Sequence, residues 1–260
     1  MPTELRHEIA RLRALKWRSW MPTAVSAISG LPLFDGIALG DLEALLTASR
    51  TIHARKNAQV FAQGAEARSF FVLVDGYVRA TKTTADGDEI VVRYVSPGEI
   101  FGIAVAIGLD SYPATAVAVV DATILCWPSE QWRTLAGKYP DLASNALRTV
   151  GRRLQDAHTR VIELTSEEVE RRVARTLLRL ADQAGRRVEQ GIEIEFPLRR
   201  QDVAQLTGTT LHSVSRVLSA WEQKGFVHTD HQRIVLHNSR ALAAIAHGDD
   251  PDPASTRASQ

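Results

Sequence analysis

The sequence predicts an α+β protein built from a β-roll, a long helix and a C-terminal winged helix-turn-helix. Three observations predict this architecture. Short β-rich runs punctuated by glycine occupy the first half of the chain. A seam of apolar residues at alternating spacings of three and four follows them. Two short helical patterns then meet at a turn built from Gly208, Thr209 and Thr210.

Composition excludes several classes of protein. The chain has 260 residues, enough for one large or two medium domains, and 45% of them are hydrophobic. No apolar run reaches the roughly 18 residues that span a bilayer, and the charged N-terminus lacks the apolar stretch of a secretory signal. We therefore expect a cytoplasmic protein with no membrane partner.

Charge and cysteine content narrow the chemistry further. The net charge is +1, so any nucleic-acid binding has to come from a local patch. Cys126 is the only cysteine, which excludes intramolecular disulfides and a four-cysteine iron–sulfur cluster within one chain. Its apolar surroundings favour burial in a strand over redox sensing.

Residues 1–29 are expected to form an N-terminal extension. Leu5, Ile9 and Leu12 lie on one side of an amphipathic helical pattern with basic residues around it. A helix docked on the protein is favoured over a membrane-surface helix. Met-Pro-Thr occurs at the start of the chain and again at Met21, so a translation start at Met21 is the alternative.

Residues 30–140 are expected to form a sensor domain. A helical segment over 30–48 is broken by Gly36 and Gly40, and β-rich runs follow it. Several short strands at regular spacing predict an antiparallel roll, whose interior can enclose a small-molecule pocket. The β-rich runs are residues 70–80, 89–102 and 114–128.

Residues 141–165 are expected to form a long helix and a hinge. Seven apolar residues in alternating steps of three and four make a coiled-coil seam, which predicts a homodimer. A helix packed only on its own domain is the alternative. The seam consists of Ala143, Leu147, Val150, Leu154, Ala157, Val161 and Leu164.

Residues 166–247 are expected to form the winged helix-turn-helix domain. Thr165 and Glu168 match a capping box, which would begin a new helix over 167–183. Gly185 would end this helix. The rest of the domain comprises a short strand over 192–198, the helix-turn-helix, and two wing strands within 226–238. The tail that follows, residues 248–260, is expected to be disordered.

The second helical pattern of the helix-turn-helix has one apolar stripe and one polar face. Such a helix is anchored by its stripe and can insert its polar N-terminal half into a DNA major groove. A surface helical hairpin in another kind of domain is the alternative. The expected DNA-contacting residues are Arg199, Gln201, Thr209, Thr210, His212, Ser213, Ser215 and Arg216.

Arg216 is the strongest candidate for reading a base. Its guanidinium can contact guanine O6 and N7 together, although a phosphate contact is the alternative. Thr209 or Thr210 would cap the helix, whose first amides can meet a phosphate. A dimer would hold two such helices over half-sites about 10 bp apart.

This order of parts resembles the Crp/Fnr family of bacterial transcription regulators over residues 30–247. The similarity is carried by SFFVLVDGYVRA, SPGEIFG, the strand after YPATA, and RQDVAQLTGTTLHSVSR followed by L-x-x-W-E-x-x-G. The resemblance implies a cyclic-nucleotide-binding-like roll. It also implies a dimer that binds a two-fold symmetric double-stranded DNA operator and recruits or blocks RNA polymerase.

The sequence departs from the family pattern at three functional positions. His212 stands where the well-known branches have a glutamate, which leaves the operator sequence open. Ile103 and Pro113 stand at or beside the positions of the glutamate and arginine that bind cyclic AMP. A buried phosphate without a counter-charge is costly, so cyclic AMP is disfavoured, although Arg93 and Glu99 lie nearby.

Three segments of the sequence bear on the identity of the effector. YPATAVAV, GTTLHSVSR and GIAVAIG are similar to nitric-oxide-responsive regulators of denitrification, which implies haem and an axial histidine. The candidate haem ligands are His7, His53 and His158, with Pro2 or Pro22 as a further candidate. Another small effector is the alternative. The expected effector pocket comprises Gly98, Phe101, Gly102, Ile103, Pro113, Ala114 and Thr115.

Two other classes of function are alternatives to a ligand-controlled regulator. A ligand-binding module of an enzyme system would leave the helix-turn-helix unexplained, and the chain has no Walker A loop, HExxH or GxSxG motif. We therefore predict that the protein is not an enzyme. A constitutive DNA binder with a vestigial sensor domain differs by having no ligand-dependent DNA affinity.

Overall fold

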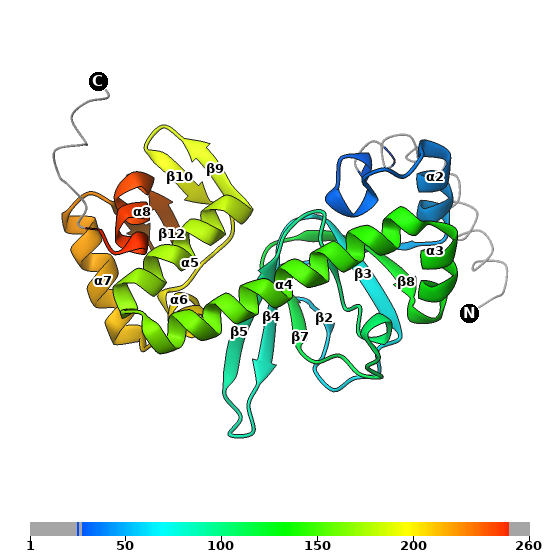
Figure 1. Cartoon of the computed structure of the whole chain (residues 1–260), viewed down its shortest axis with the longest axis horizontal. Helices are drawn as coiled ribbons and strands as arrows, with labels where there is room; N and C mark the ends of the chain where they lie inside the picture. Colours follow the sequence, from blue (N-terminus) through cyan, green and yellow to red (C-terminus); the bar gives the residue numbers. More distant parts are fainter. Residues whose placement is uncertain (1–24, 26–27, 250–260) are drawn as a thin grey trace, which may run out of the picture.

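The computed structural model describes Val25 and residues 28–249. The chain forms two lobes joined by the long helix α4 (Pro140–Ser166), which crosses from one lobe to the other (Figure 1). The N-terminal lobe is a β-roll and the C-terminal lobe contains the helix-turn-helix. The predicted α+β architecture is therefore confirmed. The predicted N-terminal helix, His7 and most of the tail lie outside the described residues.

The roll consists of two four-stranded antiparallel sheets. One sheet has the order β1-β8-β3-β6 and the other the order β2-β7-β4-β5. Apolar side chains from both sheets fill the interior, including Cys126, which is buried as predicted. The strands are β1 (Arg50–Ala54), β2 (Gln59–Phe61), β3 (Ser69–Asp75), β4 (Val78–Thr83), β5 (Glu89–Val95), β6 (Ile100–Phe101), β7 (Thr115–Ala118) and β8 (Ala122–Pro128).

Helices cover the end of the roll next to the start of α4. The segment that was predicted to be helical over 30–48 divides into η1 (Pro32–Phe34) and α2 (Leu39–Thr47). Gly36 separates them with φ +82°, a conformation that favours glycine. The prediction of a second break was wrong, because Gly40 lies inside α2. Two further elements, η3 (Ser129–Gln131) and α3 (Trp132–Lys138), lead into α4.

The predicted hinge is a break between α4 and α5 (Val169–Ala184). Glu167 and Glu168 have extended backbone angles there. The predicted capping box was wrong. The Thr165 hydroxyl instead donates to the carbonyls of Val161 and Ile162 in the preceding turn, so it belongs to the end of α4.

The C-terminal lobe is a winged helix-turn-helix. Its sheet has the order β11-β12-β10-β9, and α5 packs against α6, α7 and α8. Trp221 is fully buried at the centre of this lobe. The elements are β9 (Gly185–Val188), β10 (Gly191–Ile194), α6 (Arg200–Thr207), α7 (Leu211–Gln223), β11 (Val227–Asp230), β12 (Arg233–Leu236) and α8 (Ser239–His247).

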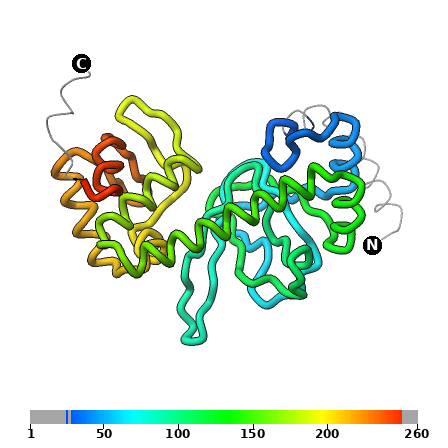
Figure 2. Tube along the Cα trace, viewed as in Figure 1, coloured from blue at the N-terminus to red at the C-terminus, as the bar shows by residue number. Residues whose placement is uncertain are grey.

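The two lobes contact each other directly as well as through α4, whose path between them is clear in Figure 2. The ring of Tyr94 on β5 stacks on Phe196 at 4.1 Å, and its hydroxyl donates to the buried carboxylate of Asp202 at 3.1 Å. The Gln205 side-chain amide accepts from and donates to the backbone of β5 at 3.0 and 2.7 Å. These bonds hold α6 against the edge strand of the roll.

None of the helices in the described part of the chain is both long enough and apolar enough to cross a membrane.

Candidate nucleic-acid interface

The turn between α6 and α7 is built by one glycine and one threonine. Gly208 ends α6 in the left-handed region with φ +59°. Thr210 begins α7, and its hydroxyl accepts from the Ser213 backbone N–H at 3.1 Å. Of the two threonines predicted to cap the helix, Thr210 is the one that does so. The remaining amides of the first turn are available to an anionic partner.

The predicted DNA-contacting residues lie in two places on the helix-turn-helix. Thr209 to Arg216 occupy the turn and the first half of α7, whereas Arg199 and Gln201 lie at the start of α6, where Arg200 bonds Glu222 near the end of α7. Val214, Val217, Leu218 and Trp221 face inward and anchor α7. The polar face of α7 and the start of α6 lie outward. Exposed side chains on this surface are Arg199, Gln201, Thr210, His212 and Arg216, and half-buried ones are Thr209, Ser213 and Ser215.

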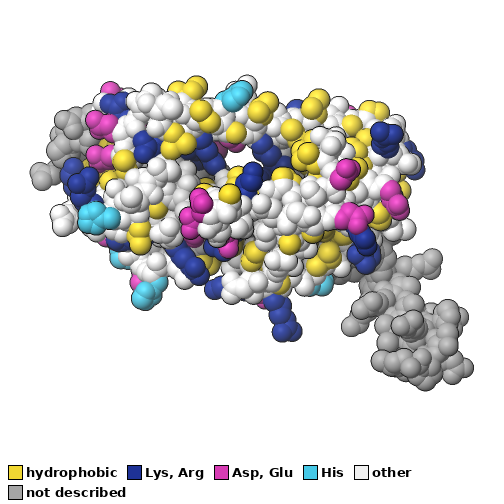
Figure 3. All heavy atoms as spheres, turned by 90° about the horizontal axis from the view of Figure 1, so that it is seen from below, with side chains coloured by type: hydrophobic (Ala, Val, Ile, Leu, Met, Phe, Trp, Pro, Cys, Tyr) yellow, Lys and Arg dark blue, Asp and Glu magenta, His cyan; other side chains and the backbone are white. Residues whose placement is uncertain are grey.

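The charge on this surface is local. Arg216 has no ion-pair partner among the described residues, so its guanidinium is available to a ligand. Figure 3, which shows the face seen from below, has Lys and Arg side chains dispersed among acidic and apolar ones. Because the net charge of the chain is only +1, attraction for nucleic acid has to come from locally placed basic side chains such as Arg216.

The apolar seam predicted on α4 is exposed over much of its length. Leu147, Leu154 and Val161 are 71%, 58% and 59% exposed, and Ile162, which the sequence pattern did not single out, is 63% exposed. Ala157 is exposed and Val150 is half-buried. An apolar stripe of this length in contact with water marks an interaction surface.

Leu164 connects the seam to the helix-turn-helix. A Cβ placed on Gly208 would lie 2.3 Å from Cδ2 of Leu164, so the absence of a side chain at Gly208 leaves room for the leucine. Sequence reasoning assigned Leu164 only to the seam. Because Leu164 contacts the turn that precedes α7, a shift of α4 at this point would be transmitted to that turn.

The residues predicted to form the effector pocket lie in different surroundings. Phe101 is buried, stacked on Phe71 and tilted against Phe61, and the Gly102 backbone packs against the rings of Phe61 and Phe71. Ile103 is buried beside Phe70 and Trp132, where the side chains leave no room for a water molecule. The others are exposed Pro113, half-buried Ala114 and Thr115, and Gly98, which lies in a turn against Pro32.

The two described haem-ligand candidates, His53 and His158, do not fit a haem site. His53 is exposed on β1 beside the Thr123 hydroxyl, and His158 is exposed on α4. Neither lines the cavity beside α4 or the packed space around Ile103. No group of three or more metal-ligating side chains occurs within those residues either. An axial ligand needs an apolar pocket around it, and these positions do not provide one.

A charged cluster joins the roll, α4 and α5. Glu99 accepts from Arg93 at 2.5 Å, from Arg153 at 3.3 Å and from Gln183 at 3.0 Å. Arg153 also donates to the Ile100 carbonyl. Burial by itself would raise the pKa of Glu99, but the two arginines more than offset this effect and lower it. Burial lowers the pKa of Arg153 to about 10.

Replacing Glu99 with glutamine should reduce stability at neutral pH and flatten the response to acid. Because its pKa is lowered on folding from the ordinary 4.5, the carboxylate stabilises the fold above that pH, and the contribution is lost as the pH falls further. Urea unfolding across a series of acidic pH values measures this. Glu130→Gln, at an exposed carboxylate, is the control. Parallel pH profiles for Glu99→Gln and wild type would contradict the assignment.

Two family models match the chain. The model described as the cyclic nucleotide-binding domain matches residues 51–139, and the model described as the Crp-like helix-turn-helix domain matches residues 171–245. The first covers the roll strands through α3. The second covers α5 through α8.

Two of the curated relatives align over more than nine-tenths of their length. The cyclic AMP receptor protein of Thermus thermophilus is 30% identical over 221 residues, which is 85% of this chain and 99% of the relative. The transcriptional activator protein FnrA of Stutzerimonas stutzeri is 25% identical over 225 residues, covering 85% and 91%.

A solved structure, a transcriptional regulator of the CRP family from Thermus thermophilus, is 27% identical with a TM-score of 0.64 and covers 78% of this chain and 99% of its own. A roll of this kind followed by a Crp-like helix-turn-helix defines a DNA-binding transcription regulator, not an enzyme. The chain belongs to the Crp/Fnr family.

Proposed function

We propose that the protein is a homodimer that binds a two-fold symmetric DNA operator under the control of a small effector. The observation that carries this proposal is the outward polar face of α7, capped by Thr210 and anchored by its buried stripe. The exposed apolar seam of α4 supports the dimer, since a second copy of the same helix can cover it. Contact with RNA polymerase and a cytoplasmic location belong to the same proposal.

Arg216 is proposed to read a guanine in each half-site. Replacing Arg216 with alanine should cost roughly 1–3 kcal/mol of operator binding and relax the base preference at one position. Fluorescence anisotropy on a set of operators with single base changes measures both effects. Arg240→Ala is the matched control, because Arg240 is an exposed arginine on α8. An unchanged base preference would remove Arg216 from direct readout.

The proposed effector is a small organic molecule. Control by nitric oxide through haem rests on the sequence similarity alone, and of its histidine candidates only His7 lies outside the described residues. A saturable Soret band that shifts with nitric oxide and accompanies tighter operator binding would favour haem. A DNA affinity that no effector changes would favour a constitutive binder.

A further inference from the structure

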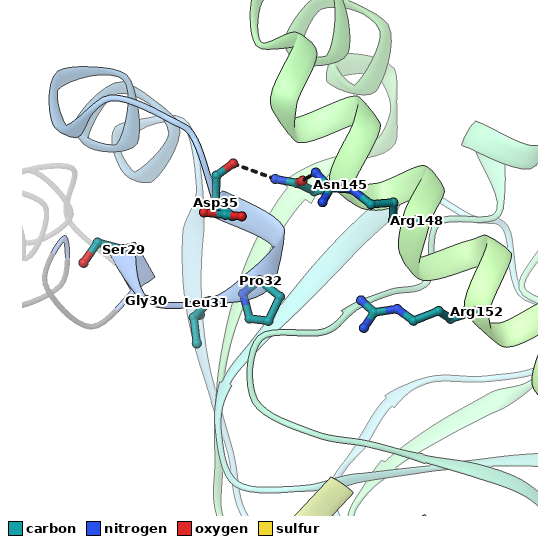
Figure 4. Close-up of a pocket in the computed structure, with 8 residues that line it drawn as sticks. All are labelled: Ser29, Gly30, Leu31, Pro32, Asp35, Asn145, Arg148 and Arg152. Carbon is teal, nitrogen blue, oxygen red and sulfur yellow. Dashed lines mark hydrogen bonds between the residues drawn. The ribbon is translucent and has the colours of Figure 1, made fainter.

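A cavity lies outside the roll interior, between the N-terminal turn and α4 (Figure 4). Its volume is about 580 Å³, which falls within the roughly 300–1,000 Å³ of small-molecule sites. None of the residues predicted for the effector pocket lines it. The lining residues are Ser29, Gly30, Leu31, Pro32, Asp35, Asn145, Arg148 and Arg152.

The wall of the cavity that α4 forms is held in place by hydrogen bonds and carries positive charge. Asn145 is buried, and its side-chain N–H groups donate to the carbonyls of Leu33 at 2.9 Å and Asp35 at 2.8 Å, which fixes the N-terminal turn against the helix. Arg148 donates to the side-chain oxygen of the same asparagine. Figure 4 shows Arg152 extending from α4 toward Pro32.

The two arginines lack a counter-ion within the described chain. Neither Arg148 nor Arg152 forms an ion pair with another described residue. They are four residues apart, so they lie on the same face of α4 and repel each other. An anion bound between the two guanidinium groups would attract both of them and so offset their mutual repulsion.

The cavity remains open in the dimer that we propose. At about 100° per residue, Asn145, Arg148 and Arg152 lie on one face of α4 and the apolar seam lies almost opposite. A partner helix on the seam therefore does not cover the arginines.

We propose that this cavity binds a small organic anion through a carboxylate or phosphate group held by Arg148 and Arg152. Guanidinium groups match the geometry of both kinds of oxyanion and can bind them with two parallel hydrogen bonds. Asp35 on the opposite wall suits a ligand whose other end carries a hydrogen-bond donor.

The site is connected to the winged lobe by packed groups. A Cβ on Gly98 would lie 2.8 Å from Cδ of Pro32, so the turn before Glu99 rests on the cavity wall. Glu99 in turn binds Arg153, the neighbour of Arg152, and accepts from Gln183 on α5. We therefore expect ligand binding to change operator affinity, an expectation that rests on the proposed function.

Calorimetric titration of the full-length protein without DNA tests the site. The probes are inorganic pyrophosphate and citrate, which separate a phosphate ligand from a carboxylate ligand. We expect saturable binding of at least one probe with a Kd of about 1 mM or tighter. Arg148→Gln combined with Arg152→Gln should weaken it at least about tenfold. The charge-matched control combines Arg187→Gln and Arg240→Gln, at exposed arginines on β9 and α8, and should bind like wild type.

Two results would overturn the site. One is the absence of saturable binding by both probes, and the other is equal binding by the Arg148/Arg152 variant and wild type. Operator titrations with and without the bound probe then test whether occupancy of the cavity changes the affinity for operator DNA. An unchanged operator affinity would overturn the proposed link between the cavity and DNA binding. Because calorimetry uses no DNA, a failure of operator binding would count against the proposed function and leave the calorimetric result decisive for the site.

Discussion

Leu154→Lys should convert the protein into a monomer and abolish operator binding. Leu154 lies in the middle of the α4 seam and is 58% exposed in the single chain. In a dimer it would be covered by its partner helix, and an unpaired charge buried there costs about 3–5 kcal/mol. A loss of this size lowers operator affinity at least about 100-fold. Light scattering after gel filtration gives the mass, and anisotropy gives the DNA affinity.

The matched control for this prediction is Gln155→Lys. Gln155 is the next residue on α4 and is exposed, but it lies outside the seam, so the same charge is added without entering the proposed interface. We expect this variant to remain a dimer. If Leu154→Lys also remained a dimer and bound operator normally, the seam would not be the interface.

Trp221→Ala should destabilise the C-terminal lobe enough to remove DNA binding. Trp221 is fully buried, and its indole N–H donates to the Glu170 carboxylate at 2.8 Å, which ties α7 to α5. Truncating a buried tryptophan to alanine costs about 3–5 kcal/mol, because apolar contacts are lost and a cavity remains. Urea unfolding followed by circular dichroism measures the loss of stability.

Trp221→Phe separates packing from hydrogen bonding at the same position. Phenylalanine keeps an aromatic ring in the core and removes the N–H donor. We expect it to cost about 1 kcal/mol for the lost bond, plus a smaller packing loss than alanine produces. Equal stabilities of the alanine variant and wild type would mean that Trp221 does not anchor α7.

Strong local patterns were sufficient to predict the main elements. The stripe from Leu211 to Trp221 predicted α7, and the alternating steps from Ala143 to Leu164 predicted α4. Both patterns repeat over several turns, so a single helical period accounts for them. β1 and β2 were not predicted, since each is short and partly exposed and gains its partners only from distant strands.

The candidate sites, like the fold, could be predicted from the sequence only in part. The outward face of α7 could be predicted because a helix places residues three and four apart on one side. The cavity beside Arg148 and Arg152 could not, because its opposite wall comes from the turn around Pro32, more than a hundred residues earlier. No local period relates segments that are so far apart in the chain.

The sequence by itself determined the order of the parts, the periodic helices and the polar face of α7. These properties depend on the spacing of neighbouring residues. Only the tertiary structure decided that Glu99 binds Arg93, Arg153 and Gln183, that Leu164 rests on Gly208, and that the predicted pocket residues are dispersed. These contacts depend on how sheets and helices pack, which the spacing of neighbouring residues does not specify.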